Sequence, residues 1–467
     1  MILIKDQYDL AGVCQLWYYW LKRITQGERR VGNIVKSCKE LIFALQKGEY
    51  DSVLTQLYAP SGNESELTAA RQRAMNLVET FGRVFAPSEQ MSVGLFSAPG
   101  RTEIGGNHTD HQHGHVLCAG VDLDTLACAA PNRTNVIRIR SEGYPTLAVE
   151  LNDLLPRAEE EGTSAALVRG VAAKLTQMGY AIGGFDACMT SDVLSGSGLS
   201  SSAAYEVLIG IILNRLFCGG QLDAIEIAKI GQYAENVYFG KPCGLMDQMA
   251  SSVGGVVSID FTDTAKPVVE RVEYDFLQAG HALCIIDTGS CHADLTEDYA
   301  EIPREMGAVA AYFGKAHLRQ VSREQFEESI GSLRRVYGDR AVLRAMHFYD
   351  DDARAVQEAE CLRKGDFDGF LALVNESGLS SALLLQNIYT CNEPKQQAVS
   401  LALAVGRRLL NGTGAIRVHG GGFAGTIQAF VPTDRLETFR AGMEQLLGEG
   451  SCFVLGIRPV GGCVITD

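Results

Sequence analysis

An arginine, a histidine and an aspartate lie close together in one glycine-rich segment, at Arg101, His108 and Asp110. Pro99 and Gly100 directly precede the arginine, and two more glycines separate it from the histidine. Glycine lets the backbone approach a bound ligand closely, and functional side chains are often presented by such turns. We therefore expect a tight turn that offers a cation, an imidazole and a carboxylate to a small ligand.

A second segment, residues 196–204, is rich in serine and glycine. It joins an expected strand over 185–192 to an apolar helical pattern that begins at Tyr205. A glycine-rich loop that opens a helix presents unpaired N–H groups and the positive end of the helix dipole, which suits a triphosphate. A linker or a plain helix cap is the alternative, although linkers seldom join a strand directly to a long apolar helix. The candidate phosphate-binding residues are Gly196, Ser197, Gly198, Leu199, Ser200, Ser201 and Ser202.

Two further segments follow. One runs from Glu235 to Asp247 and ends Cys-Gly-Leu-Met-Asp, and the other begins at His419 and reads His-Gly-Gly-Gly-Phe-Ala-Gly. Taken in this order, the segments resemble the motifs of the galactokinase branch of the GHMP small-molecule kinases. The resemblance extends from about Leu67 to the C-terminus, with Leu194 where the family has a proline. It implies an α+β, two-lobed GHMP kinase fold with the active site between the lobes.

The resemblance also implies a sugar 1-kinase that uses ATP and Mg²⁺. It places Asp247 at the anomeric hydroxyl of the sugar and Arg101 beside it, where a positive charge would lower the pKa of the carboxylate. Asp247 would then accept the hydroxyl proton while the oxygen attacks the γ-phosphoryl group. Glu235 and Ser202, or the neighbouring Ser201, would hold Mg²⁺, because that ion needs few protein ligands and prefers oxygen.

For the sugar, the resemblance assigns His108, Asp110, Gly244 and Tyr299. The chain departs from the family at Asn107, where the family has a glutamate that contacts the sugar near its 6-hydroxyl. Loss of that negative charge removes a repulsion worth roughly 1–4 kcal/mol against a nearby carboxylate, so a carboxylate at C6 of the sugar would be repelled less strongly. By its position in the motif, Asn107 is expected to bind the substrate, and galactose is the first candidate. Galacturonate, or another hexose modified at C6 or C2, is the alternative.

The bulk composition is that of a folded globular enzyme. The 467 residues are 46% hydrophobic and 21% charged, enough for two or three domains, and the formal net charge is −15. An acidic chain without clustered lysine and arginine is not expected to bind nucleic acid or an anionic membrane. The 13 cysteines form no C-x-x-C pair and no secretory signal is visible, so we expect reduced thiols and a cytoplasmic location.

Hydrophobic periodicity divides the chain into three expected parts. Residues 1–62 form a helical extension of unknown role, 63–275 an N-terminal lobe with the sugar and phosphate motifs, and 276–467 a C-terminal lobe. The apolar face of a helix over 67–85 is expected to comprise Ala70, Ala74, Leu77, Val78 and Phe81. Further helices are expected at 202–217, 222–238 and 353–371, and strands at 187–189, 256–259, 282–286, 415–418 and 426–430. The extension is interpreted as a helical hairpin packed on the body, with self-association or partner binding as the alternative.

Two other functions compete with the kinase. His111, His113 and His115 would share one face if they lay on a strand, as in a zinc hydrolase, although no second ligand cluster is evident. The other competing hypothesis is a sensor protein that binds sugar and ATP without turnover. Arg101, Glu235 and Asp247 speak against the sensor, because the residues that the resemblance makes catalytic are all present.

Overall fold

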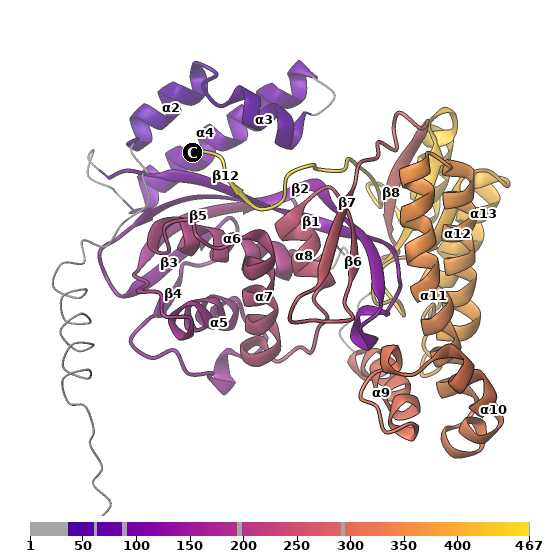
Figure 1. The fold of residues 1–467 in the computed structure, drawn as a ribbon. Helices are drawn as coiled ribbons and strands as arrows, with labels where there is room; N and C mark the ends of the chain where they lie inside the picture. Colours follow the sequence, from indigo (N-terminus) through magenta and orange to yellow (C-terminus); the bar gives the residue numbers. More distant parts are fainter. Residues whose placement is uncertain (1–35, 60–62, 86–90, 194–198, 291–294, 467) are drawn as a thin grey trace, which may run out of the picture.

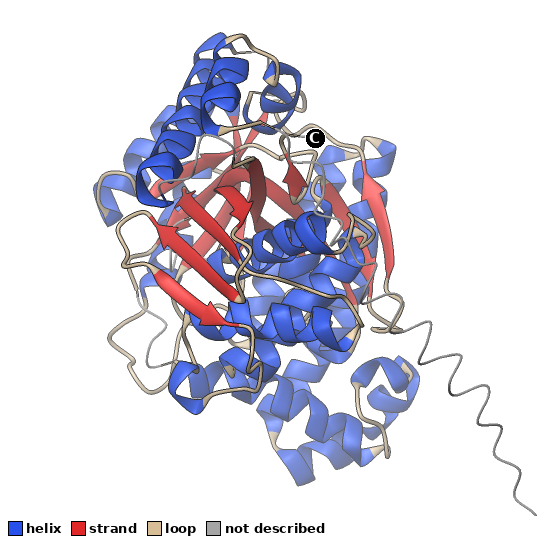
Figure 2. Cartoon of the chain, turned by 90° about the vertical axis from the view of Figure 1, so that its left-hand side faces the viewer, coloured by secondary structure: helices blue, strands red, loops and turns tan. Residues whose placement is uncertain are grey.

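The computed structural model describes residues 36–59, 63–85, 91–193, 199–290 and 295–466. Two β-sheets and the helices that cover them make up this part of the chain (Figure 1). The α+β class expected from the interleaved apolar patterns is confirmed. In a view rotated by 90°, the strands form an inner layer with helices outside it (Figure 2).

The larger sheet has eight strands, of which six run in the order β12-β1-β2-β5-β3-β4, while β6 pairs with both β2 and β7. Its strands are β1 (Gly94–Gly105), β2 (His115–Pro131), β3 (Val136–Ser141), β4 (Leu147–Glu150), β5 (Phe185–Ser191), β6 (Val256–Asp260), β7 (Val268–Val272) and β12 (Cys463–Val464). The smaller sheet has the order β11-β8-β10-β9. Its strands are β8 (His281–Asp287), β9 (Ala415–Val418), β10 (Thr426–Pro432) and β11 (Cys452–Leu455). The expected boundary at 275/276 lies between β7 and β8, which belong to different sheets.

Helices cover both faces of the larger sheet, because apolar side chains point to either side of it. On one face, α5 (Ser164–Gln177), α6 (Ser201–Phe217) and α7 (Ala224–Ala234) bury their apolar sides. On the other face lie α2 (Cys38–Gln46), α3 (Asp51–Tyr58) and α4 (Glu64–Phe85). The remaining helices are α8 (Met246–Val253), α9 (Thr296–Tyr312), α10 (Arg323–Tyr337), α11 (Asp339–Lys364), α12 (Phe367–Ser380), α13 (Ala398–Leu410) and α14 (Leu436–Leu447).

The N-terminal helices within the described residues pack on the body of the protein. The five apolar residues expected on one face of the helix over 67–85 are the buried residues of α4, which begins three positions earlier, at Glu64. Leu41, Leu45, Leu54 and Leu57 from α2 and α3 join the same core. The helical pattern expected before residue 36 lies outside the described residues. The alternative role of the extension, self-association or partner binding, stays a prediction.

Most expected strands and helices are confirmed, and two expectations are wrong. The segment expected to be a tight turn is, up to Gly105, the fully buried strand β1, which pairs with β2 and accommodates Pro99 at a bulge. The helix expected over 353–371 is two helices. They are separated at Gly365, which has a φ of 71°, and Asp366 then caps α12 by accepting the Gly369 N–H. The helix expected over 222–238 becomes π-helical from Glu235 onward.

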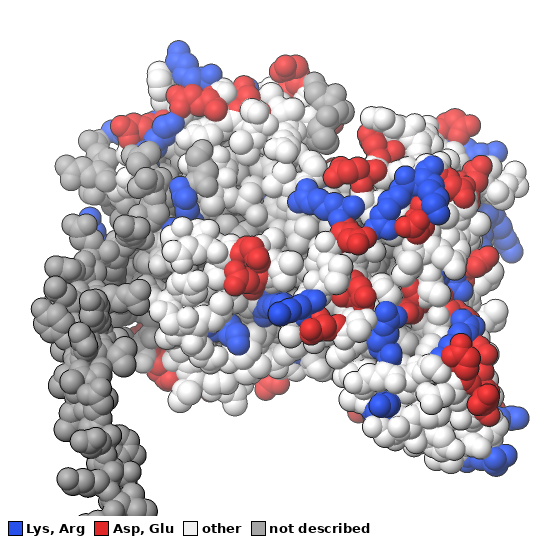
Figure 3. Space-filling model, in the orientation of Figure 1, with Lys and Arg blue, Asp and Glu red and all other residues white. Residues whose placement is uncertain are grey.

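None of the helices in the described residues is long and apolar enough to cross a membrane. On the face shown in Figure 3, acidic and basic side chains are interspersed.

Candidate active site

The structure brings Arg101 and Asp247 together from distant parts of the chain. Arg101 lies in β1 and Asp247 in the first turn of α8. Arg101 Nε donates to Asp247 Oδ1 at 2.6 Å and Nη2 donates to Oδ2 at 2.8 Å. This bidentate pair fixes the orientation of the carboxylate as well as its charge.

The electrostatics of this pair favour an ionised aspartate. Burial by itself would raise the pKa of Asp247, but the Arg101 charge and the hydrogen bonds from Arg101 and Ser200 outweigh it and lower the pKa to about 2. The start of α8 adds the positive end of a helix dipole. The side chain of Asp247 is 23% exposed and that of Arg101 only 7%. A carboxylate that is ionised, oriented and open to a cavity is what the expected transfer chemistry requires.

The start of α6 lies against this pair. Ser200, which has a left-handed φ of 54°, precedes the helix and donates from Oγ to Asp247 Oδ2. Leu199 buries its side chain in the core, and its carbonyl oxygen accepts the Arg101 N–H at 3.1 Å. The predicted phosphate-binding residues Gly196, Ser197 and Gly198 lie outside the described residues. The first turn of α6, whose N–H groups have no partners within the helix itself, begins next to Asp247.

Glu235 forms a second carboxylate site at the first turn of the same helix. Ser202 Oγ donates to Glu235 Oε1 at 3.0 Å, and Lys241 Nζ lies 3.3 Å from the same oxygen. Gln248 Nε2 donates to Glu235 Oε2 at 2.7 Å and to Glu206 Oε2 at 3.1 Å. The two residues expected to hold Mg²⁺ are thus adjacent, and each offers an oxygen of the kind that this ion prefers.

A cavity connects Asp247 with the segment after β1. It is lined by Arg101, Glu103, His108, Asp110, His111, Lys241, Cys243, Gly244, Met246, Asp247, Tyr299, Gly420 and Gly421. A Cβ atom on Gly244 would lie 1.7 Å from Asp110 Oδ2, so only glycine allows the Asp110 carboxylate this close to the loop before α8. The predicted sugar-binding residues Asp110 and Gly244 therefore meet at the cavity.

His108 and Tyr299 form an aromatic side of this cavity together with His111. The ring centroids of His108 and Tyr299 are 5.2 Å apart, and His111 Nε2 lies 3.1 Å from the Tyr299 hydroxyl. Burial lowers the pKa of His108 to about 3, so its ring is neutral and Nε2–H donates to the Gly421 carbonyl at 2.9 Å. His108 Nδ1 is buried and has no hydrogen-bond partner among the described residues.

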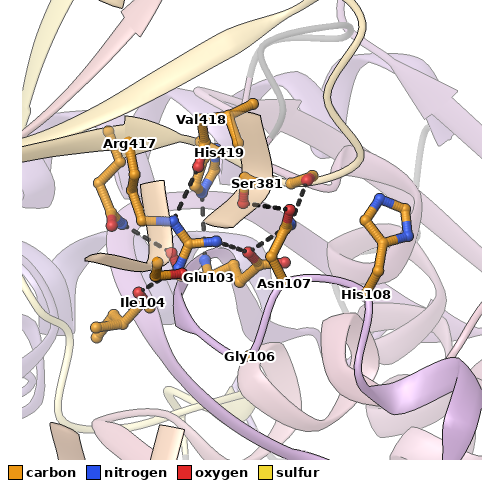
Figure 4. A network of polar contacts seen from close by, with 12 residues as sticks. Glu103, Ile104, Gly106, Asn107, His108, Ser381, Arg417, Val418 and His419 are labelled. Atoms are coloured by element: carbon orange, nitrogen blue, oxygen red, sulfur yellow. Dashed lines mark hydrogen bonds and ion pairs between the residues drawn. The ribbon is translucent and has the colours of Figure 1, made fainter. Parts of the chain in front are cut away.

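Asn107 is not placed as the sequence suggested. Its side chain is fully buried and is not part of the cavity lining. Nδ2 donates to Glu103 Oε1 at 2.9 Å and to the Gly420 carbonyl at 2.8 Å. Oδ1 accepts from Ser381 and Asn387 at 3.2 and 2.9 Å. These four bonds use the donors and acceptors of the amide, so Asn107 links β1 to the turn after β9 and to the segment after α12 rather than facing a ligand (Figure 4).

The loss of charge expected at position 107 is offset by Glu103. This glutamate lines the cavity, and its Oε1 accepts from Arg417 Nη2 at 2.6 Å as well as from Asn107. Burial raises the pKa of Glu103 to about 7, against the opposing effect of the Arg417 charge. The sequence predicts, from Asn107, the loss of a carboxylate from the sugar site, but Glu103 supplies a carboxyl group there, so that inference is wrong.

Sequence reasoning missed Glu103, His111 and Lys241 as cavity residues. Glu103 could have been found from the period of two in a strand, because it stands two positions after Arg101 on the same face of β1. No sequence signal marked Lys241, whose side chain is 53% exposed beside Glu235. The sequence pattern predicts His111 only as a possible zinc ligand.

The zinc arrangement of the histidines is contradicted by the geometry. Residues 110–112 form a 3₁₀ turn rather than a strand, and His113 has a left-handed φ of 62°. His113 stacks on His317, whereas His115 pairs with Asp352 at 3.0 Å. Across the described ranges, no three side chains from histidine, cysteine, aspartate and glutamate are grouped as a metal site would require.

A larger cavity of about 660 Å³ lies elsewhere, between α4 and the strands β3 and β5. It contains Arg73 and Arg140 but none of the paired carboxylates described above. Chemistry rather than volume therefore identifies the cavity at Asp247 as the candidate active site.

Two parts of the chain match known family models. Residues 166–255 match the N-terminal domain of the GHMP kinases, and residues 79–131 match the galactokinase galactose-binding signature. The second match contains Arg101 and the segment that follows it.

Solved structures share the fold. A Lactococcus lactis galactokinase complexed with galactose superposes with a TM-score of 0.71 at 25% identity, over 82% of this chain and 98% of that one. A mevalonate kinase from L. major gives 0.54 at 15% identity, over 79% and 97%. A D-glycero-D-manno-heptose 1-phosphate kinase from Bacteriodes thetaiotaomicron gives 0.52 at 16%, over 79% and 97%. The similarities to the mevalonate kinase and to the heptose 1-phosphate kinase concern the fold alone.

Proposed function

Because this chain is a galactokinase-like member of the GHMP kinases, we propose that it transfers the γ-phosphoryl group of ATP to the anomeric hydroxyl of galactose. The observation that carries the proposal is the bidentate pair of Arg101 with Asp247 beside the start of α6. An ionised carboxylate beside a helix start supports the proposal, because a sugar hydroxyl needs such an acceptor and a triphosphate needs such a helix start.

The hydrogen bonds of Asp247 indicate where the sugar hydroxyl donates. Oδ2 accepts from both Arg101 and Ser200, whereas among the described residues only Arg101 donates to Oδ1. A carboxylate oxygen can accept two hydrogen bonds, so Oδ1 keeps one position for the anomeric hydroxyl. With a pKa of about 2 the aspartate is a weak base, so it orients the hydroxyl first and takes the proton late, once the new P–O bond has formed.

Arg101 has two tasks in this mechanism. It keeps Asp247 ionised and fixed, and its guanidinium is a positive charge next to the point of transfer. The backbone N–H groups of Ser200, Ser201 and Ser202 and the hydroxyl of Ser201 are proposed to bind the phosphates. The hydroxyls of Ser200 and Ser202 already donate to Asp247 and Glu235.

Glu235 and Ser202 are proposed to hold Mg²⁺. They fit the ion because a buried carboxylate and a hydroxyl 3.0 Å apart leave most coordination positions to phosphate oxygens and water. When bound, the ion would neutralise charge on the transferred phosphoryl group. Gln248 keeps Glu235 oriented from the other side.

Four residues of the cavity are proposed to bind the sugar. The Asp110 carboxylate and the Gly244 backbone lie against each other, and His108 and Tyr299 present ring surfaces and polar atoms. The match to the galactose-binding signature supports galactose as the sugar. The expectation of a direct contact from Asn107 is not retained, because its amide is already fully hydrogen-bonded within the protein.

A coupled assay of ADP release tests the proposal. Purified protein is given ATP and Mg²⁺ with galactose, glucose, N-acetylgalactosamine or galacturonate in turn, and the product is identified by phosphorus NMR. We expect turnover with galactose, formation of a sugar 1-phosphate, and loss of activity when Mg²⁺ is chelated and its return when Mg²⁺ is added back. Binding of galactose and ATP without any ADP release would favour the sensor instead.

Two further expectations remain proposals. The absence of C-x-x-C pairs in the sequence is the basis for a cytoplasmic location. The division at 275/276 assigns the sugar and phosphate motifs to the first lobe, and its basis is the change of sheet between β7 and β8.

A further inference from the structure

Arg101 and Glu103 stand on the same face of one strand. They are two positions apart in β1, the strand is regular between them, and both line the cavity. Two residues of a strand span about 6–7 Å, which is comparable to the length of one hexopyranose with its exocyclic group. If the anomeric hydroxyl lies at Arg101 and Asp247, the opposite end of the sugar reaches Glu103.

Glu103 is held in place from behind. Its Oε1 accepts from Arg417 Nη2 at 2.6 Å and from Asn107 Nδ2 at 2.9 Å (Figure 4). Asn107 is itself fixed by four hydrogen bonds, and Glu103 is only 3% exposed. The carboxyl group therefore cannot swing away to make room for a different substituent.

The cation that pairs with Glu103 is not available to a ligand. Arg417 is fully buried, and its three nitrogen atoms donate to Val418 O, Ile104 O and Glu103. Asn107 likewise donates both hydrogens of its amide group, to Glu103 and to the Gly420 carbonyl. At this end of the cavity a ligand meets a hydrogen-bond acceptor, while the matching donors lie behind it.

We propose that Glu103 is a specificity-determining residue that admits a neutral hexose, whose C6 hydroxyl can donate to it, and rejects a sugar with a carboxylate at C6. The inference rests on the proposed sugar-kinase function. A hydroxyl donates to the acceptor that Glu103 presents, whereas a uronic acid carboxylate offers acceptors only and repels the like charge. Because the cavity keeps a carboxyl group at Glu103, the loss of charge at Asn107 no longer argues for galacturonate as the alternative substrate.

A pair of ligands with the same shape and different charge tests this on the unaltered protein. Galacturonate and galacturonamide differ only in a carboxylate against a neutral amide, whose N–H can donate to Glu103. Binding of each, and of galactose, is measured by isothermal titration at about pH 8.5, where a group with a pKa of about 7 is ionised. We expect the amide to bind at least about tenfold tighter than the acid. Equal binding, or tighter binding of the acid, overturns the inference.

Substitution of the residue provides the second test. Glu103→Gln keeps the length and the acceptor oxygen but removes the charge, so the ratio of amide to acid affinity should fall to within about threefold of unity. The matched control is Glu358→Gln on α11. Glu358 is also a buried carboxyl group, and it lies against Gly105 of the same strand but outside the cavity lining. That variant should keep the wild-type ratio.

The outcomes separate this inference from the proposed function. If galactose is turned over but galacturonate and galacturonamide bind with equal affinity, the kinase function is supported and the proposed role of Glu103 is wrong. A preference for the amide that persists in Glu103→Gln assigns the discrimination to another group and also overturns the inference. Failure of all these sugars to bind or to turn over contradicts the proposed function itself. If Glu103→Gln does not fold, the ligand pair still decides on the unaltered protein.

Discussion

Asp124 and Asp247 are both carboxylates that pair with arginine, yet only one of them faces a cavity. Asp124 is fully buried in β2 and is bound by Arg73 from α4 at 2.6 Å and by Arg458 from the C-terminal segment at 3.1 Å. Tyr58 at the end of α3 also donates to it, at 2.6 Å. Asp247 has one arginine partner, and its side chain is 23% exposed.

The two sites differ in whether the carboxylate keeps an acceptor position for a ligand. Ser97 of β1 donates to Asp124 as well, so donors from four elements surround it and its charge joins the N-terminal helices, the sheet and the C-terminal segment. Asp247 keeps an acceptor position open toward the cavity. Arginine lowers the pKa of both groups against the effect of burial. A lowered carboxylate pKa therefore does not by itself distinguish a structural pair from a catalytic one, and access does.

Asp247→Asn is expected to have the largest effect on activity. The amide preserves the shape but can neither orient the hydroxyl as an acceptor nor take its proton, so kcat should fall by about 10³-fold or more. The loss of stability should stay below about 2 kcal/mol, because Arg101 borders a cavity that water can enter. Steady-state kinetics and urea unfolding measure the two quantities. A variant with wild-type kcat would remove Asp247 from the mechanism.

Asp124→Asn should show the reverse pattern. Two arginines would lose the charge that compensates them in a buried site, so the free energy of unfolding should fall by about 3–5 kcal/mol. The KM for galactose should remain within about twofold of wild type at a temperature where the variant is folded. Urea unfolding followed by circular dichroism measures the loss. An unchanged unfolding midpoint would mean that Asp124 does not hold these elements together.

The pH dependence of kcat provides a third contrast. Asp247, with a pKa of about 2, stays ionised as the pH falls to about 4, so it contributes no acid limb between about pH 5 and 8. In Arg101→Met the guanidinium no longer opposes burial, the pKa of Asp247 rises, and kcat should increase with pH within that range. Profiles of both proteins at saturating galactose are compared. Parallel profiles would show that Arg101 does not set the ionisation of Asp247.

Tyr58→Phe is expected to have the smallest effect. It removes one hydrogen bond to a charged acceptor while Arg73 and Arg458 remain, so the free energy of unfolding should fall by about 1.5 kcal/mol. Activity should be unchanged, since Tyr58 lies on the sheet face opposite α6. Comparison of unfolding midpoints tests this. No change at all would indicate that α3 is held by its apolar contacts alone.

Local patterns predicted much of the fold. The apolar face of α4 and the strand segments of both sheets follow from periodicity in neighbouring residues, which is a local property. The helix over 353–371 was predicted wrongly because its apolar pattern continues through Gly365, where the chain turns. Proline and glycine around Arg101 predict a turn because both are frequent in turns, and only pairing with β2 makes this segment the buried strand β1.

The sequence by itself determined which chemical groups are present. They are the Arg101 guanidinium, the Asp247 carboxylate and a helix start of the kind that binds phosphate, each in a motif that can be recognised from neighbouring residues. Only the tertiary structure decided which side chains face the ligand. Asn107 is turned inward because residues about 270 to 310 positions later saturate its amide, and Glu103 is left at the cavity because Arg417 holds it there. Contacts across such separations depend on how two sheets pack, and no local spacing encodes that.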